Sequence, residues 1–421
     1  MQKTSPPYVI LGCGYVGTRL AQSLLADGVQ VRVCARRTTL LEPLHAQGAQ
    51  VHYLEASRSH QFGPAMLGLD QPIVVYSIPG VMGMPAGEAV RRAASAALRV
   101  HARAFIYLGS SAVYGRSEGN SNSDWVDEES TTAPSDPEAG TRLADEAAVA
   151  SISQSGMRSV ILRLAAIYGP SLAPHLAARG VRQRLRSGQY RLFDGGRYFF
   201  SRIFVDDLAR IIRAAGDYAQ GSGSTLNTYV VGDDHPCPQL EYVTWLTEHL
   251  KAPMPPSVDS HLAGAGQVIR GRRLNNKKLK RELGLSLLYP TFREGEAQID
   301  ACEHSGSLPV LRYSKEGGAA AGPSDSDAGR MPVLPPLQQV QSGSDLGVSL
   351  GGAPIGVTFV RMAAGERREL SSPALIVGGY ISVSRAGHVE GAGPRVLIPA
   401  GANLYNLGPE PAEILILPSQ S

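Results

Sequence analysis

Cysteine is scarce in this chain of 421 residues. There are only four, all far apart from one another: Cys13, Cys34, Cys237 and Cys302. Their spacing contains no Cys-x-x-Cys pair, which argues against a disulfide framework and against a zinc site built from cysteines. The ten histidines, including His101, His175 and His235, also lack the spacing of metal ligands. We therefore expect a reducing compartment and no bound metal.

Long apolar runs and blocks of like charge are missing as well. No apolar stretch approaches the ~20 residues of a membrane span, and the N-terminal segment leads directly into a predicted strand. The net charge of +3 comes from scattered lysines and arginines, without the basic arm that is typical of nucleic-acid binding. We expect a soluble, cytoplasmic protein that acts on a small molecule and binds neither nucleic acid nor membranes.

The length of the chain and its apolar content of 43% are sufficient for more than one core. From Tyr8 onward, short apolar runs alternate with helical patterns, which is typical of βαβ units and a parallel sheet. The segment 303–333 is rich in Gly, Ser, Ala, Asp and Pro, which predicts a flexible linker. We therefore predict an α/β domain over 1–302, with a Rossmann-type doubly wound parallel sheet, then the linker and a small all-β domain over 334–421.

Individual elements follow from the same patterns. The predicted strands of the first domain are 8–11, 29–33, 50–54, 73–77, 104–108, 160–164, 202–205 and 227–231. The predicted helices are 16–26, 40–47, 87–100, 206–215 and 239–250. In the last segment, Gly/Pro turns separate predicted strands at 356–362, 374–383, 395–398 and 412–417.

A glycine-rich turn, GCGYVG at 12–17, connects the first predicted strand to a helix. This context is the one that a G-x-G-x-x-G string requires. Gly12 permits the tight turn, Gly14 removes a side chain that would hold a pyrophosphate off the backbone, and Gly17 lets helix and strand pack closely. The helix N-terminus supplies N–H groups for the anion. The pattern predicts a dinucleotide site; a glycine-rich turn without a ligand is the alternative.

The end of the second predicted strand bears on which dinucleotide is bound. NAD-preferring domains place an Asp or Glu there for the ribose 2′-hydroxyl, but this chain has Ala35, followed by Arg36 and Arg37. Two guanidinium groups attract a 2′-phosphate through charge-assisted hydrogen bonds. We therefore predict NADP(H) rather than NAD(H), with two solvated arginines on a loop as the alternative.

Further segments, in order along the chain, resemble the extended short-chain dehydrogenases/reductases, the NAD-dependent epimerase/dehydratase group. They are FIYLGSSAVYG (105–115), WVDE (125–128), LRLAAIYGP (162–170), RIFVDDLA (202–209), and RRLNNKKL (272–279) with YPTFREG (289–295). The resemblance covers residues 8 to about 300 and implies that substrate is held by the part from about 170 to 300.

The resemblance also implies which residues carry the chemistry. The family uses a Ser or Thr after the fifth strand, here Ser110, and a Tyr-x-x-x-Lys pair on the next helix. Glu138 and Arg142 stand at the positions of that tyrosine and lysine, and no tyrosine occurs between Tyr114 and Tyr168. Arg142 could hold a ribose or a phosphate, but it stays protonated and cannot relay a proton. A weak surface pair of Glu138 and Arg142 is the alternative.

These arguments define the candidate site. The candidate catalytic residues are Ser110, Glu138 and Arg142, and the candidate cofactor-binding residues are Gly12, Cys13, Gly14, Tyr15, Val16, Gly17, Arg36, Arg37, Ser77, Ile78, Ser110 and Ala166. Asp206 and Asp207 could suggest a paired-carboxylate site, but they begin a predicted helix, so we expect them to cap it.

The C-terminal segment resembles a cupin barrel at 365–370 with 375–383 and at 399–406, where the turn Pro399-Ala400-Gly401 is the more specific feature. Metal-binding cupins place His-x-His and Glu in the first region and His in the second, whereas this segment has only His388, outside both. We expect a small barrel without metal that binds an apolar ligand, mediates homodimerisation, or has a purely structural role.

Two functions of different class are compatible with these motifs. The first is an NADP(H)-dependent oxidoreductase or epimerase/dehydratase of atypical short-chain type, acting on a small carbonyl or hydroxyl substrate. The second is a catalytically silent NADP(H)-binding sensor or scaffold whose C-terminal domain contacts the partner. The missing Tyr-Lys pair favours the second, whereas Ser110 and the retained substrate-side segments favour the first, which we expect.

Overall fold

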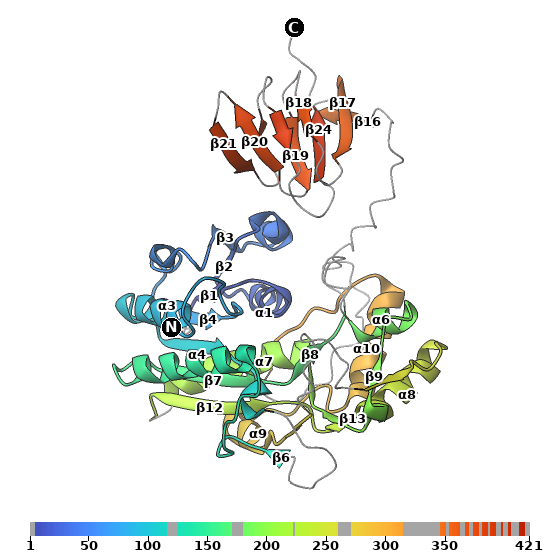
Figure 1. Ribbon diagram of the computed structural model, residues 1–421. Helices are drawn as coiled ribbons and strands as arrows, with labels where there is room; N and C mark the ends of the chain where they lie inside the picture. Colours follow the sequence, from blue (N-terminus) through green and yellow to red (C-terminus); the bar gives the residue numbers. More distant parts are fainter. Residues whose placement is uncertain are drawn as a thin grey trace. The chain divides into compact units, whose positions relative to one another are not determined.

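A computed structural model describes residues 5–115, 125–170, 180–221, 224–259 and 271–314, together with the backbone of nine strands between Leu346 and Ile416. The chain divides into two compact units, Met1–Val333 and Leu334–Ser421, and each is described by itself (Figure 1). None of the described helices is both long and apolar enough to cross a membrane.

A seven-stranded parallel sheet forms the centre of the first unit, in the order β12-β7-β5-β4-β1-β2-β3 (Figure 1). The strands are β1 Tyr8–Leu11, β2 Val31–Ala35, β3 Gln50–Tyr53, β4 Ile73–Tyr76, β5 Ala104–Leu108, β7 Ser159–Leu164 and β12 Leu226–Val231. The chain runs outward from β1 through β2 and β3 and returns to β4 on the other side of β1. The strand order therefore reverses between β1 and β4, where open α/β sheets bind their ligands.

Four long helices cover the two faces of this sheet: α1 Tyr15–Ala26 and α7 Val205–Gly221 on one face, α3 Glu88–Arg99 and α4 Pro137–Ser153 on the other. The central strands β1, β4 and β5 are buried along their whole length, and their sequences accordingly place apolar side chains on both faces.

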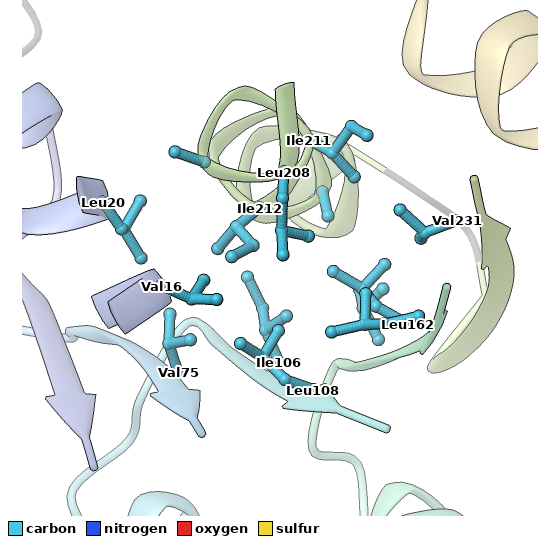
Figure 2. Packing of buried hydrophobic residues seen from close by; sticks show 14 of the residues in the cluster. Val16, Leu20, Val75, Ile106, Leu108, Leu162, Leu208, Ile211, Ile212 and Val231 are labelled. Atoms are coloured by element: carbon cyan, nitrogen blue, oxygen red, sulfur yellow. The ribbon is translucent and has the colours of Figure 1, made fainter. Parts of the chain in front are cut away.

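The core beneath α1 and α7 shows how the two helices meet the sheet. Figure 2 shows Leu20 of α1 and Ile212 of α7 above Ile106 of β5, and all three are fully buried. Successive strand residues point to opposite faces, so Phe105 and Tyr107 of β5 belong to the other core, beneath α3 and α4.

The remaining elements of the first unit are mostly short. They are η1 Thr38–Leu41, α2 Glu42–Ala46, η2 Ser59–Gln61, η3 Ser111–Tyr114, β6 Trp125–Val126, β8 Ala166–Tyr168, α6 Val181–Arg186, β9 Leu192–Phe193, η5 Asp194–Gly196, β10 Phe199–Phe200, β11 Arg202–Phe204, β13 Cys237–Pro238, α8 Gln239–Leu250, β14 Ser257–Val258, β15 Arg273–Leu274, α9 Lys277–Leu283 and α10 Phe292–Ser305. Helices α6, α8 and α10 share a smaller core, built from residues such as Leu185, Tyr242 and Phe292.

The predicted linker begins too early. Residues 303–305 complete helix α10, and the segment after it packs against the first unit. Leu311 is buried, and the N–H of Tyr313 donates to the carboxylate of Asp27 at 3.1 Å. The linker was predicted from local composition, which does not reveal contacts with residues that lie almost 300 positions earlier in the chain. The predicted helix at 40–47 also differs, because it consists of η1 followed by the short α2.

The described part of the second unit consists of two antiparallel sheets, β16-β17-β24-β19-β22 and β18-β23-β20-β21. Their strands are β16 Leu346–Leu350, β17 Ala353–Met362, β18 Arg367–Glu369, β19 Ala374–Gly378, β20 Ile381–Arg385, β21 His388–Ala392, β22 Leu397–Ile398, β23 Asn403–Tyr405 and β24 Ala412–Ile416. The single strand predicted at 374–383 is wrong, because the segment contains two strands, β19 and β20, which belong to different sheets. The turn Pro399-Ala400-Gly401 lies outside the described residues, and the cupin barrel stays a prediction.

Candidate functional site

The glycine turn lies where the strand order reverses, between β1 and helix α1. Gly12 has a φ of +89°, and a Cβ built on it would lie 2.7 Å from Cγ1 of Ile78. Only glycine fits this backbone conformation and this close approach of the chain after β4. The N–H of Ser77 donates to the carbonyl of Leu11 at 2.8 Å, which fixes the segment beside the turn.

The other two glycines have different surroundings. A Cβ at Gly17 would lie 3.0 Å from Cγ2 of Ile10, so this glycine allows α1 to pack closely on β1. A Cβ at Gly14 would meet nothing within 4 Å, so the space in front of Gly14 is open. The three glycines thus occupy the positions that the sequence predicts for a tight turn, an open ligand face and close packing.

Helix α1 begins without a cap. Gly14 is its N-cap residue and makes no side-chain capping hydrogen bond, and the first turn contains no acidic residue. The first N–H groups of a helix have no partner within the helix and carry the positive end of its dipole. The open face at Gly14 therefore has the donors and the potential that bind a phosphate.

The side chains between the glycines point elsewhere. Cys13 and Val16 are buried in the core beneath α1, so they could contribute only backbone groups to a ligand. The hydroxyl of Tyr15 donates to the carbonyl of Pro170 at 3.0 Å, which joins the glycine turn to the turn after β8. Ala166, at the start of β8, is exposed. Whether these residues contact a cofactor stays a prediction.

Arg36 and Arg37 follow β2 and are both exposed. Arg36 is 74% exposed at its side chain, and its Nε lies 3.9 Å from Oε2 of Glu55. Glu55 follows β3, the neighbour of β2, and its position was not recognised from the sequence. Glu55 could have been recognised from its position just beyond the end of β3. The carboxyl ends of adjacent parallel strands meet at one edge of the sheet, which places Glu55 near the residues that follow β2.

Ser110 lies at the carboxyl end of β5. It is half-buried, and its Oγ accepts the N–H of Ala112 at 3.2 Å as the N-cap of η3. Glu138 is exposed in the first turn of α4, whereas Arg142 is half-buried one turn further on. The structure places these three residues on adjacent elements, since α4 packs against η3.

Asp145, on the same helix, is a buried carboxyl group that the sequence analysis missed. It accepts the hydroxyl of Tyr107 at 2.9 Å and the N–H of Gly87 at 3.1 Å. Burial raises the pKa of Asp145, while Tyr107, Arg142 and the Gly87 N–H act in the opposite direction. A cavity of about 270 Å³ opens beside it, lined mainly by residues of the loop between β4 and α3 and by Thr141 and Asp145 of α4. Asp145 could have been noticed in the sequence because it lies three residues after Arg142, on a neighbouring part of the helix surface.

A second buried network links α4 to β7. Arg163 pairs with Glu146 at 2.9 Å and donates to the hydroxyl of Tyr114 at 2.8 Å. That hydroxyl donates in turn to the carbonyl of Asp127 at 2.6 Å. Burial raises the pKa of Tyr114 to about 12, so it is a poor substitute for the missing catalytic tyrosine. Tyr168 is no better, because burial raises its pKa even further.

Asp206 and Asp207 lie in the first turn of α7, where the sequence predicts them, but their side chains also accept hydrogen bonds from other elements. Asp206 pairs with Arg19 of α1. Asp207 accepts the N–H groups of Leu288 and Tyr289, both at 2.8 Å, and also pairs with Arg210. The two carboxylates therefore stabilise contacts between distant parts of the chain, which the local sequence does not show.

The parallel sheet, the glycine turn and the uncapped start of α1 define a Rossmann-type α/β protein. The chain belongs to the NAD dependent epimerase/dehydratase family, whose model matches residues 8–232. The family and the α/β class expected from the sequence are thus confirmed.

Solved structures of this architecture are similar to the first unit. A conserved protein of unknown function from Silicibacter pomeroyi DSS is 25% identical, with a TM-score of 0.56 over 70% of this chain and 99% of its own. MoeE5 in complex with UDP-glucose and NAD is 19% identical, with a TM-score of 0.59 over 72% and 100%. UDP-glucose 4-epimerase from Thermotoga maritima is 16% identical, with a TM-score of 0.59 over 71% and 99%. The last two likenesses concern the fold alone. No curated protein matches the sequence.

Proposed function

We propose that the chain is an NADP(H)-dependent oxidoreductase or epimerase/dehydratase of atypical short-chain type that acts on a small carbonyl or hydroxyl compound. The observation that carries the proposal is the open space in front of Gly14, at the uncapped N-terminus of α1. A backbone free of side chains and a helix end with unpaired donors suit the pyrophosphate of a dinucleotide. Membership in an NAD-dependent family supports the same site.

The preference for NADP(H) rests on Arg36 and Arg37. Both are exposed just beyond β2, where the chain has Ala35 instead of a carboxylate. Their charge and hydrogen-bonding geometry favour a 2′-phosphate over a 2′-hydroxyl. Glu55, 3.9 Å from Arg36, opposes this preference in part.

A bound nicotinamide would exchange a hydride with the substrate. Ser110 can donate its hydroxyl hydrogen to a substrate oxygen, because its Oγ already accepts the N–H of Ala112. Arg142 can hold a phosphate or a ribose as a permanent cation. Asp145 lines the cavity beside α4 and is a carboxyl group able to exchange a proton there.

Binding and turnover can be tested separately. Titration of the full chain with NADPH and NADH, followed by fluorescence, should show NADPH bound at least ~10-fold more tightly, as expected for one or two charge-assisted hydrogen bonds. The double variant Arg36→Ala/Arg37→Ala should lose that ratio and keep NADH binding. Equal affinities in the unmodified chain, or an unchanged ratio in the variant, would show the arginine argument to be wrong.

Turnover is tested with a panel of aldehydes, ketones, alcohols and nucleotide sugars. It is followed as a change in cofactor absorbance and also by chromatography of the products, because an epimerase or dehydratase returns the nicotinamide to its starting state. Nucleotide sugars are included because MoeE5 and the Thermotoga maritima epimerase contain UDP-glucose. An enzyme should convert at least one class, and Ser110→Ala should slow it by ~100-fold or more, as for loss of a transition-state donor. Tight NADPH binding without turnover across the panel favours the catalytically silent sensor instead.

A further inference from the structure

A histidine, a cysteine and a glutamate come together between β12 and α8 of the first unit. The atoms with which His235, Cys237 and Glu241 could bind a metal all lie within 4.8 Å of one another. His235 and Glu241 are joined by a hydrogen bond of 2.9 Å between Nε2 and Oε1. The cluster comes from one short segment, His-x-Cys-x-x-x-Glu, and is distinct from the dinucleotide site.

These three side chains are a donor set that zinc accepts. Nitrogen, thiolate and carboxylate ligands at about 2.0–2.3 Å from a tetrahedral ion lie about 3.4–3.6 Å apart. To bind the ion, Nε2 of His235 and Oε1 of Glu241 must therefore move slightly apart. Those ligand atoms that now lie more than about 3.6 Å from each other must approach by about 1 Å, which side-chain rotation allows. Cys237 is buried, whereas the side chains of His235 and Glu241 are 39% and 38% exposed. The partly open side leaves room for water as a fourth ligand.

The surroundings of the cluster contain an unexplained polar atom. Asp233 is 1% exposed, and its Oδ2 has no hydrogen-bond partner among the described residues. Its Oδ1 accepts the N–H of His235 at 3.2 Å. A buried carboxylate oxygen without a partner is expensive, unless nearby charge compensates it. Asp233 thus holds the backbone of His235 in place beside the proposed ligands.

Arg202 lies on the other side of the thiol. One of its N–H groups donates to Sγ of Cys237 at 3.4 Å, and its guanidinium lies 3.9 Å above the ring of Tyr242. A donor of this kind stabilises a thiolate and orients it, as outer partners of metal ligands do. A thiolate at Cys237 and the carboxylate of Glu241 would together neutralise the charge of Zn²⁺. Arg293, 3.4 Å from Glu241, competes for that carboxylate at the surface.

We propose that His235, Cys237 and Glu241 bind one zinc ion per chain, and that the thiol proton of Cys237 is released to solvent when the metal binds. The proposal departs from the expectation of no bound metal, which considered the spacing of cysteines and of histidines separately. A metal here would fix the connection between β12 and α8, and so stabilise the smaller core to which Cys237 belongs.

The test uses the untagged, full-length chain, reduced and freed of metal with a chelator. After addition of Zn²⁺ and removal of the excess, elemental analysis should find one zinc per chain. Titration with Co²⁺ should produce the charge-transfer absorption of a thiolate bound to cobalt. Cys237→Ser should abolish this absorption and weaken zinc binding by at least ~100-fold, and the exposed Glu241→Gln should weaken it by ~10-fold or more.

Two matched controls separate this site from non-specific binding. Cys302→Ser removes another buried thiol, which accepts a hydrogen bond from Gln298. His249→Gln removes another histidine paired with a carboxylate, that of Asp300, but without a cysteine beside it. Both variants should keep one zinc and the cobalt absorption. Substoichiometric zinc, no thiolate absorption, or absorption that survives in Cys237→Ser overturns the proposal. None of these measurements depends on whether the chain binds NADPH.

Discussion

The guanidinium of Arg19 and the carboxylate of Asp206 form two hydrogen bonds, of 2.5 and 2.8 Å, between helix α1 and the first turn of α7. Both side chains are only 2% exposed. Arg19 also donates to the carbonyl of Pro309 at 2.9 Å. The helix that begins at the glycine turn is therefore fixed to α7 and to the segment after α10 through one buried arginine.

Removing one member of this ion pair should be strongly destabilising. Asp206→Asn leaves Arg19 as a buried cation with a weaker partner, which should lower the free energy of unfolding by about 3–5 kcal/mol. Urea denaturation followed by circular dichroism measures the loss. Arg281→Gln, in the exposed pair with Glu282, is the control and should change stability by less than ~1 kcal/mol. Equal effects of the two variants would contradict the prediction.

The glycines of the turn should separate binding from stability. Gly17→Val should lower the free energy of unfolding by about 1–3 kcal/mol, because its Cβ would press on Ile10. Gly14→Val should cost about 1 kcal/mol or less but weaken NADPH binding by at least ~10-fold, since its side chain fills the open face. Thermal unfolding and cofactor fluorescence provide the two readouts. Full affinity in Gly14→Val would place the pyrophosphate elsewhere.

Glu55 should weaken the binding of a 2′-phosphate. Its carboxylate lies 3.9 Å from Arg36, so Glu55→Gln removes a repulsive charge and a competitor for the guanidinium. We expect the affinity for NADPH to rise about 2–5-fold, the range for a partly exposed charge pair, with NADH unchanged. Titrations at low and high salt check the electrostatic origin, since screening should reduce the gain. An equal gain for NADH would show that Glu55 does not discriminate between the two.

The contact between helices α6 and α10 should loosen in acid. Arg182 of α6 pairs with Asp300 at 2.5 Å and with Glu303 at 3.1 Å, both on α10. Burial alone would raise the pKa of Asp300, but its hydrogen bonds with Arg182 and His249 outweigh burial and hold the pKa below its usual range. Burial and the partners Arg186 and Arg182 act on Glu303 in the same way, and its pKa is also lowered.

A carboxylate whose pKa is lowered by folding stabilises the native state above its unfolded pKa, and this contribution disappears as the pH falls through the folded pKa. The free energy of unfolding should therefore fall as the pH is lowered from about 5 toward 3. Asp300→Asn should lose about 1–2 kcal/mol at pH 7 and show a flatter acid dependence. The exposed Asp70→Asn should leave the slope unchanged; a slope equal to the unmodified chain in Asp300→Asn contradicts the assignment.

Much of the fold could be predicted because its signals are local. Strands β1 and β5 and helix α8 have the predicted bounds, since apolar runs with the right period are bounded by turn residues there. Helix α10 was not predicted. Its buried face includes Glu296, which accepts hydrogen bonds from Arg182 and Tyr242, so its pattern of polar residues conceals a buried surface.

The candidate site divides in the same way. The glycine turn could be predicted because its backbone conformation and close contacts require glycine at fixed positions, and the spacing of those glycines is visible in the sequence. Asp145 and Glu55 were missed, because their sequence positions are weak signals and their partners Tyr107, Gly87 and Arg36 lie elsewhere in the chain. Long-range partners of charged residues are set by the topology, and a single sequence does not display them.

The pairing of Arg19 with Asp206 also constrains the order of folding. The two residues are 187 positions apart, and Arg213 reaches back 190 positions to Ser23. During synthesis, the strands and helices that surround the glycine turn leave the ribosome before Asp206, the partner of Arg19, has been made. Contacts of such sequence separation form late and slow the folding of a domain. The part of the sheet around the glycine turn should therefore complete its native packing only after α7 has been synthesised and has packed against α1.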